Sequence, residues 1–233
     1  MWPNWGAITF CMSFKGRFYQ PWWGVKKFCN ELEEVDEYLL RQILNAHSKT
    51  PKEMLHLETG TIPVEYIIKS RRLSYLHHIL TREKYELISK VFYAQKRKPV
   101  KDDWAETVKK DMDEIQLNLS EENIKTMKKN KFKEHLKKKI NQAAFNDLLK
   151  RKDSHSKVDH INFKNFEAQA YIKSYKFKTV DKQLLFKLRT RMTNVKANFK
   201  TMHENIHCDL CDEEVLQNDA LLLDNYKLSY FIE

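Results

Sequence analysis

Apolar residues recur every three or four positions along most of this chain, which is the spacing of α-helices that bury one face. The strongest run is 62–80, where apolar residues spread around almost the whole helix. Pro63 suits the first turn of this helix, because its missing N–H would have no partner there. A helix that is apolar nearly all round is a core helix, so we expect 62–80 to be packed against on more than one side.

The same spacing predicts helices on both sides of this core helix. A first helix begins near residue 31, and its apolar positions are Leu32, Val35, Leu39, Ile43 and Ala46. Next, Thr50 and Glu53 predict a capping box, with Thr50 as the N-cap and Glu53 reaching back to it. Gly60 predicts a left-handed C-cap that ends the short helix between them.

Further helices are predicted in the second half of the chain. They run from 85 to before Pro99, from Asp102 and Asp103, from Ser120, over 131–152, over 163–172, and from Thr179 to about Phe199. Four glycines and five prolines are few for a β-rich protein, which needs turn residues at every hairpin. The sequence therefore predicts an all-α fold, an irregular bundle of about eight helices with poorly ordered ends.

Changes in composition predict four regions. They are a Trp-rich arm at 1–23, a helical region at 24–152, a second helical part at 153–211 and an acidic tail at 212–233. The polar stretch 153–157 is the most linker-like segment and marks the boundary between the two helical regions.

Basic residues outnumber acidic ones by 42 to 32, and the excess is unevenly placed. Residues 121–152 carry eleven Lys and Arg against four acids (+7), and residues 164–200 carry ten against two (+8). Residues 204–233 carry one Lys against eight acids (−7). A basic body of this kind favours polyanionic partners, of which nucleic acid is the first candidate.

The helix predicted at 180–200 is the strongest candidate for a binding surface. Cations flank its apolar stripe: Lys182, Arg189, Lys196 and Lys200 on one side, Lys187 and Arg191 on the other. Such a row can follow a phosphate backbone without reading bases, and a solvated basic face is the alternative interpretation. Lys137 and Lys138 extend the candidate surface to the other basic region.

Arg71 and Arg72 fall inside the main apolar sector of the core helix. One interpretation is that they pair with acids such as Glu58 or Glu65 as structural arginines. The other is that they line a groove where a phosphate can enter.

Cys208 and Cys211 form a C-x2-C pair, which is half of many zinc sites. A structural zinc needs four ligands, and no Cys or His follows this pair. His203 and His207 lie upstream, but their spacing matches no site geometry that we can assign. We therefore expect no zinc and no other cofactor.

Other chemistry has little support in the sequence. Asp102 and Asp103 are placed to start a helix, where acids favour the positive end of its dipole, rather than to hold metal ions. No Gly-rich phosphate loop or nucleophile elbow occurs. Four cysteines are too few for a disulfide scaffold, no signal peptide is recognisable at 1–14, and no apolar run approaches the roughly 18 residues that span a bilayer. We expect an intracellular protein, nuclear or cytoplasmic, with no membrane partner.

Five segments, taken in order, resemble the region downstream of the polymerase core in endonuclease–reverse transcriptases of non-LTR retrotransposons. They are EEVDEYLLRQIL at 33–44, SKTPKEML at 48–55, IIKSRRLSYLH at 67–77, PVKDDW at 99–104 and LLFKLRTRM at 184–192. The resemblance spans about 24–215, which is most of the chain.

In that family the segment after the fingers and palm is a helical thumb and linker that ends in a C-x2-C…H…C zinc knuckle. The resemblance implies a role in handling RNA and DNA, with Cys208 and Cys211 as the first two knuckle ligands. The chain departs from the pattern because 212–233 holds neither the His nor the last Cys. It also carries neither the palm carboxylates of an RNA-directed DNA polymerase nor an endonuclease domain, so the resemblance transfers no catalytic residue.

Two hypotheses of different classes follow from the sequence. The first is a nucleic-acid-binding C-terminal fragment of a retrotransposon reverse transcriptase, which contacts RNA or DNA through backbone phosphates. The second is a helical protein-interaction module, or a remnant without function. A continuous basic surface favours the first, whereas cations scattered on all sides or paired with the protein's own acids favour the second.

Overall fold

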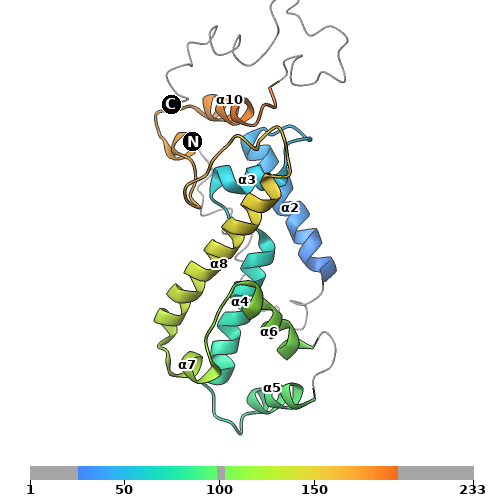
Figure 1. The fold of residues 1–233 in the computed structure, drawn as a ribbon, viewed down its shortest axis with the longest axis vertical. Coiled ribbons are helices and arrows are strands. Elements are labelled where there is room, and N and C mark those ends of the chain that lie inside the picture. The colour runs from blue at the N-terminus through green and yellow to red at the C-terminus, as the bar shows by residue number, and fades with distance from the viewer. Residues whose placement is uncertain (1–25, 99–102, 194–233) are drawn as a thin grey trace, which may run out of the picture. The chain divides into compact units, whose positions relative to one another are not determined.

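The computed structural model of the chain describes residues 26–98 and 103–193 (Figure 1). Within these residues all regular secondary structure is helical and no strand occurs, so the predicted all-α class is confirmed. The nine helices among them are α2 (Lys26–Leu44), α3 (Lys52–Thr59), α4 (Val64–Leu80), α5 (Leu87–Arg97), α6 (Trp104–Glu114), α7 (Glu121–Thr126), α8 (Lys129–Lys152), α9 (Ala170–Lys173) and α10 (Thr179–Arg189).

The helices belong to two compact units. Within the described residues, the first unit comprises 26–38, 61–98 and 103–149, and the second comprises Leu39–Gly60 and 150–193. The chain passes from one unit to the other within α2, between α3 and α4, and within α8. The linker-like stretch 153–157 lies in the second unit.

Helix α4 is the core of the first unit. Helices α5, α6 and α7 pack against it, as Figure 1 shows. Its buried residues are Val64, Tyr66, Ile68, Lys69, Leu73, Leu76, His77, Ile79 and Leu80, which cover most of its circumference as the sequence predicts. The His77 ring nitrogen Nε2 lies 2.9 Å from the Met127 carbonyl oxygen, and the ring stacks on Phe132 at 4.8 Å. His77 is therefore a core histidine with its polar atom satisfied.

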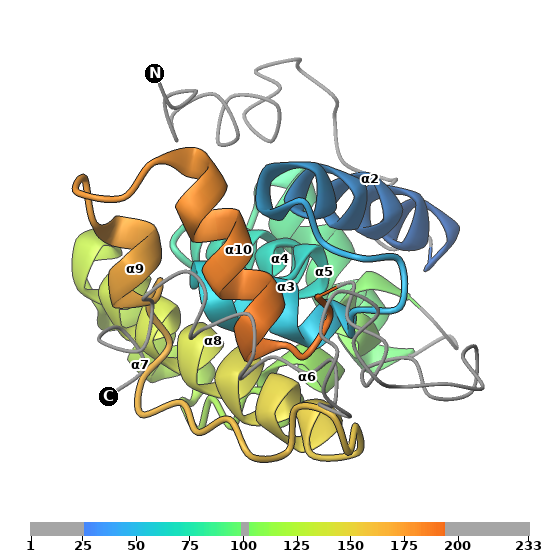
Figure 2. The same cartoon turned by 90° about the horizontal axis from the view of Figure 1, so that it is seen from above.

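A smaller apolar cluster holds the second unit together. It consists of Leu40, Leu44, Leu55, Ile172 and Phe186, with Ala46, Ala168 and Tyr171 packed at its edge. Helices α9 and α10 contact each other directly and lie side by side in Figure 2. This arrangement brings the end of α2 and Leu55 of α3 against segments more than 100 residues later in the chain.

Helix ends that depend on local residues follow the prediction. Gly60 adopts φ 64° and ψ 25°, and its N–H donates to the His56 carbonyl. A Cβ at this position would also lie 2.3 Å from the Ala168 nitrogen, so only glycine fits. The Asp103 side chain accepts from the Glu106 N–H at 2.7 Å, and Ser120 caps α7 in the same way by accepting from the Asn123 N–H at 3.2 Å.

The capping box predicted at 50–53 is wrong. The N-cap of α3 is Pro51, with no side-chain hydrogen bond, and the Thr50 hydroxyl is buried with no partner. The Arg41 guanidinium donates to the Thr50 carbonyl at 2.8 Å, while the Glu53 carboxylate lies 3.5 Å from the His155 ring. Contacts with distant residues thus hold both members of the predicted box.

Three further predictions need correction. The buried face of α2 carries Asp36, Leu40 and Leu44 at four-residue spacing, whereas Leu32 and Val35 are exposed. No helix forms over 163–172 except the short α9, because the Gln169 N–H donates to the Glu58 carbonyl instead of continuing a helix.

Helix α10 is also shorter than predicted. It ends at Arg189, and Arg191 takes a left-handed backbone with φ 51°. The Met192 N–H then donates to the Lys187 carbonyl at 2.8 Å, which closes a turn at the point where the sequence predicts a continuing helix.

Candidate nucleic-acid interface

The cations predicted on α10 do not form one exposed row. Lys182 is 5% exposed, and its Nζ donates to the Ile172 carbonyl at 2.8 Å. Burial lowers the pKa of its ammonium group. Arg189 Nε donates to the Glu58 carboxylate at 2.9 Å. Lys182 is therefore not the exposed cation that the sequence predicts, and Arg189 is half-buried and paired with an acid of the second unit.

Glu58 explains why Arg189 is held. Its side chain is fully buried and accepts from the Tyr171 hydroxyl at 2.8 Å as well as from Arg189. Burial raises the pKa of Glu58, although Arg189 and Tyr171 oppose that change by stabilising the carboxylate. Burial and the neighbouring Glu58 also raise the pKa of Tyr171. A buried acid that accepts from Arg189 ties this arginine to the core.

The remaining predicted positions on and after α10 are placed differently. Lys187 is half-buried on α10, and Arg191 is exposed just after the helix. Lys196 and Lys200 lie outside the described residues.

Arg72 of the core helix is a structural arginine. Its Nε and one terminal nitrogen donate to the two oxygens of Asp111 at 2.6 and 2.8 Å, and both side chains are nearly buried. The acid that Arg72 binds through these two nitrogens is Asp111, and not Glu58 or Glu65 as the sequence suggests. Arg71, one residue earlier, is exposed on α4.

Five exposed lysines lie on the first three turns of α8. We call these residues the α8 lysine face: Lys129, Lys133 and Lys137 form one row at four-residue spacing, and Lys131 and Lys138 lie on another side of the same helix, all exposed. Glu134 is the one acid in this stretch. A row at four-residue spacing on the same helix is buried: Phe132, Leu136, Ile140, Ala144 and Leu148. Lys137 and Lys138 thus lie where the sequence predicts exposed cations.

The sequence gives no reason to single out Lys129, Lys131 and Lys133, which appear there only in the regional charge surplus. Their exposure follows once the buried residues of α8 are known to recur every four positions from Phe132. Lys129, Lys133 and Lys137 occupy the next row of the helix surface.

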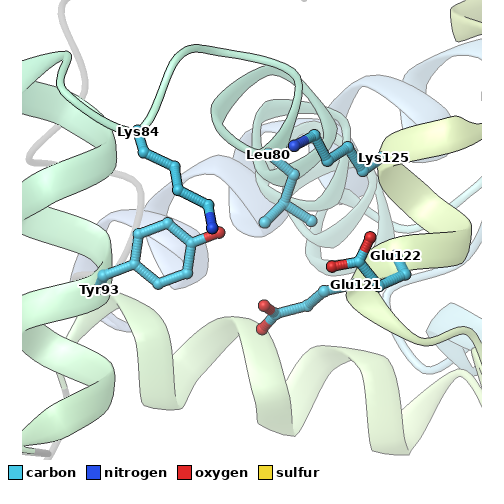
Figure 3. A pocket seen from close by; sticks show the side chains of 6 residues that line it. All are labelled: Leu80, Lys84, Tyr93, Glu121, Glu122 and Lys125. Atoms are coloured by element: carbon cyan, nitrogen blue, oxygen red, sulfur yellow. The ribbon is translucent and has the colours of Figure 1, made fainter.

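A polar hollow of about 310 Å³ lies beside α7 in the first unit (Figure 3). Its lining residues are Leu80, Lys84, Tyr93, Glu121, Glu122 and Lys125. Lys96 forms an ion pair with Glu121. Because two carboxylates and two ammonium groups face this space, it has no net preference for an anion and adds nothing to the lysine face.

The described part of the chain contains no candidate metal site. Among residues 26–98 and 103–193, no three His, Cys, Asp or Glu side chains are placed to hold an ion together. The weak candidates Cys208, Cys211, His203 and His207 lie outside these ranges. Cys29 is half-buried, and burial raises the pKa of its thiol. None of the helices in the described ranges is long and apolar enough to cross a membrane.

No protein-family description, no curated protein and no solved structure matches the chain. The resemblance to retrotransposon reverse transcriptases therefore stays a prediction from the five sequence segments.

Proposed function

We propose that this protein binds RNA or DNA through backbone phosphates, with the α8 lysine face as the principal contact. The observation that carries the proposal is that five exposed lysines and a single acid occupy residues 129–138 of one helix. Each lysine that neutralises a phosphate releases a condensed counterion, so a row of them gives salt-dependent binding without sequence preference.

The geometry of α8 supports contact with successive phosphates. Lys129, Lys133 and Lys137 recur every four residues, which advances the helix by about 6 Å at each step. The first turn of α8 contains no acid. Its lysines therefore face the positive end of the helix dipole, which costs about 0.3–1 kcal/mol per charge at a surface. A bound polyanion relieves this repulsion, whereas a role in helix stability does not explain it.

The origin that we propose is the C-terminal region of a non-LTR retrotransposon reverse transcriptase, acting in the nucleus or cytoplasm. Support comes from the order of the five resembling segments and from the helical content expected of a thumb and linker. The segment at 67–77 lies within the core helix α4.

A helical protein-interaction module is the second candidate. Leu32, Val35 and Tyr38 favour it, because they are exposed at three-residue spacing on α2. This candidate predicts no salt-dependent binding of either nucleic acid.

The experiment measures fluorescence anisotropy of labelled single-stranded RNA and of duplex DNA against the full chain at several salt concentrations. We expect binding that weakens steeply with salt. In the double variant Lys133→Gln/Lys137→Gln, the slope of log affinity against log salt should fall by about 2 on duplex DNA, one unit for each lost phosphate contact.

The matched control is Lys90→Gln/Lys109→Gln, which removes two exposed lysines from α5 and α6 of the same unit. It changes net charge equally and should leave the slope unchanged. Equal losses in both variants would mean that only net charge matters, and absence of binding at low salt would refute the proposal.

A further inference from the structure

The loop that joins α9 to α10 carries an exposed aromatic residue, and both helices can be followed in Figure 2. Tyr175 is 92% exposed, the highest fraction among the exposed large hydrophobic residues of the described ranges. Single apolar residues are common on a protein surface, so exposure alone does not make a binding site. Two further features, the fixed backbone of the loop and the charges beside the ring, indicate a ligand.

Hydrogen bonds fix the backbone on both sides of Tyr175. The Ile172 carbonyl accepts from the buried Lys182 ammonium group at 2.8 Å, which ties the end of α9 to α10. The Lys176 N–H donates to the Ser174 hydroxyl at 3.2 Å, so these two residues close a turn across Tyr175. The ring therefore extends from a fixed turn, and a ligand that packs on it loses little affinity to the ordering of the loop.

Lysines are the only charged residues of α9 and of the loop after it. They are Lys173, Lys176 and Lys178, all exposed. The acids that precede and follow them are engaged in this region, because Glu167 pairs with Lys173 at 2.6 Å and Asp181 accepts from the Lys178 backbone N–H at 3.0 Å. The loop thus combines an exposed aromatic ring with positive charge, which suits an anionic ligand that has a flat apolar face.

A single-stranded nucleic acid has this chemistry. Its unpaired bases can stack on an aromatic ring, and its phosphates can contact lysines nearby. A duplex presents phosphates too, but its bases are paired and stacked on one another. We infer that Tyr175 stacks on an unpaired base of a single strand, with Lys176 and Lys178 against the neighbouring phosphates. The inference rests on the proposed function, since it names the form of nucleic acid that is bound, but it uses residues of the second unit in place of the α8 lysine face.

The experiment measures fluorescence anisotropy of three labelled probes against the full chain. The probes are oligodeoxythymidylate, an abasic strand of the same length, and duplex DNA. Because the abasic strand keeps the phosphates and lacks the bases, it separates stacking from charge. Tyr175→Ala should weaken binding of oligodeoxythymidylate by about tenfold, the effect of losing one base on an aromatic ring, and should leave binding of the abasic strand and of the duplex unchanged.

Two matched variants control for this result. Tyr175→Phe keeps the ring and should bind all three probes as the parent protein does. Tyr85→Ala removes a tyrosine that is 72% exposed in the first unit, and it should change none of the affinities. Unchanged affinity of Tyr175→Ala for oligodeoxythymidylate, an equal loss on the abasic strand, or an equal loss in Tyr85→Ala overturns the inference.

The lysines of the loop have a separate readout. Lys176→Gln/Lys178→Gln should reduce the salt slope by about 1.4 on both single strands, since each phosphate contact with a single strand contributes about 0.7. An unchanged slope in this variant removes the two lysines from the inference. The proposed function fails separately: if Lys133→Gln/Lys137→Gln keeps the parent slope on duplex DNA while Tyr175→Ala loses affinity for the single strand, only the α8 lysine face is refuted.

Discussion

The basic stretches that contain α8 and α10 have similar charge surpluses, but their cations are placed differently in the structure. Residues 121–152 and 164–200 carry charge surpluses of +7 and +8, so composition ranks them as equal candidates. In the structure the α8 lysine face is exposed, whereas Lys182 and Arg189 of α10 are bound to a carbonyl and a carboxylate of the second unit. Charge density alone therefore does not identify a surface that can meet a polyanion.

The position of a charge relative to the buried row of its helix explains the difference. Lys182 precedes buried Leu185 and Phe186 by three and four residues, so it lies on the side of α10 that packs inward. On α8, Lys152 continues the four-residue row of buried positions, and it is buried with its Nζ bound to the carbonyls of Asp159 and Ile161. Lysines outside such a row can extend into solvent.

The largest expected effect comes from breaking the pair that removes Arg72 from the candidate surface. Arg72→Met leaves the Asp111 carboxylate, which is 3% exposed, without its bidentate partner. Loss of one member of a buried ion pair costs about 3–5 kcal/mol, so the free energy of unfolding in denaturant should fall by that amount.

The control for this variant is Arg72→Met/Asp111→Leu, which removes both charges and should recover much of the stability. A single variant that keeps its stability but loses nucleic-acid affinity would instead place Arg72 with the lysines of α8.

The second effect concerns an acid in a buried row. Asp36 precedes Leu40 and Leu44 at four-residue spacing on α2, and burial together with Glu33 raises its pKa to about 6. The folded state therefore holds a proton at Asp36 that the unfolded chain, with a pKa of about 3.9, releases first. The stability that Asp36 contributes should be fully present below about pH 4 and should be lost, by about 3 kcal/mol, as pH rises through 6.

Asp36→Asn should remove this fall, so the variant should be more stable than the parent protein above pH 6. Denaturation of both proteins at several pH values measures their free energies of unfolding. Burial also raises the pKa of Glu58 and Asp111, so these two acids make stability fall with pH in the variant and in the parent protein alike. The test is therefore the difference in free energy of unfolding between the two proteins. A constant difference from pH 4 to pH 7 would contradict the assignment to Asp36.

Features of the fold that depend on neighbouring residues could be predicted from the sequence. The caps at Gly60, Asp103 and Ser120 each depend on residues within about four positions. The core helix is predictable because apolar residues surround most of its circumference. Features decided by distant residues could not be predicted. Helix 163–172 is replaced by an irregular segment because the Gln169 N–H meets the Glu58 carbonyl, 111 positions earlier by number.

The candidate site was predictable only in part for the same reason. Exposure of Lys137 and Lys138 follows from the helical spacing of α8 alone. The partners of Arg72 and Arg189 lie 39 and 131 positions away, and no local pattern connects them. One local signal distinguishes Lys182 from the exposed lysines: it lies three and four residues before apolar positions that are buried on its own helix.

The smallest expected effect compares Lys182 with Lys137 through the same substitution. Lys182→Met leaves the Ile172 carbonyl without its donor and should lower the free energy of unfolding by about 1–2 kcal/mol, with no change in the salt slope of nucleic-acid binding. Lys137→Met, on the exposed side of α8, should change stability by less than about 0.5 kcal/mol and reduce that slope by about one unit. Denaturation measures the free energy of unfolding of each variant, and fluorescence anisotropy measures the salt slope of its nucleic-acid binding. Because methionine keeps most of the lysine's length, a loss of affinity in Lys182→Met at unchanged stability can only come from the lost charge. That result would return α10 to the binding surface and remove the distinction between the two helices.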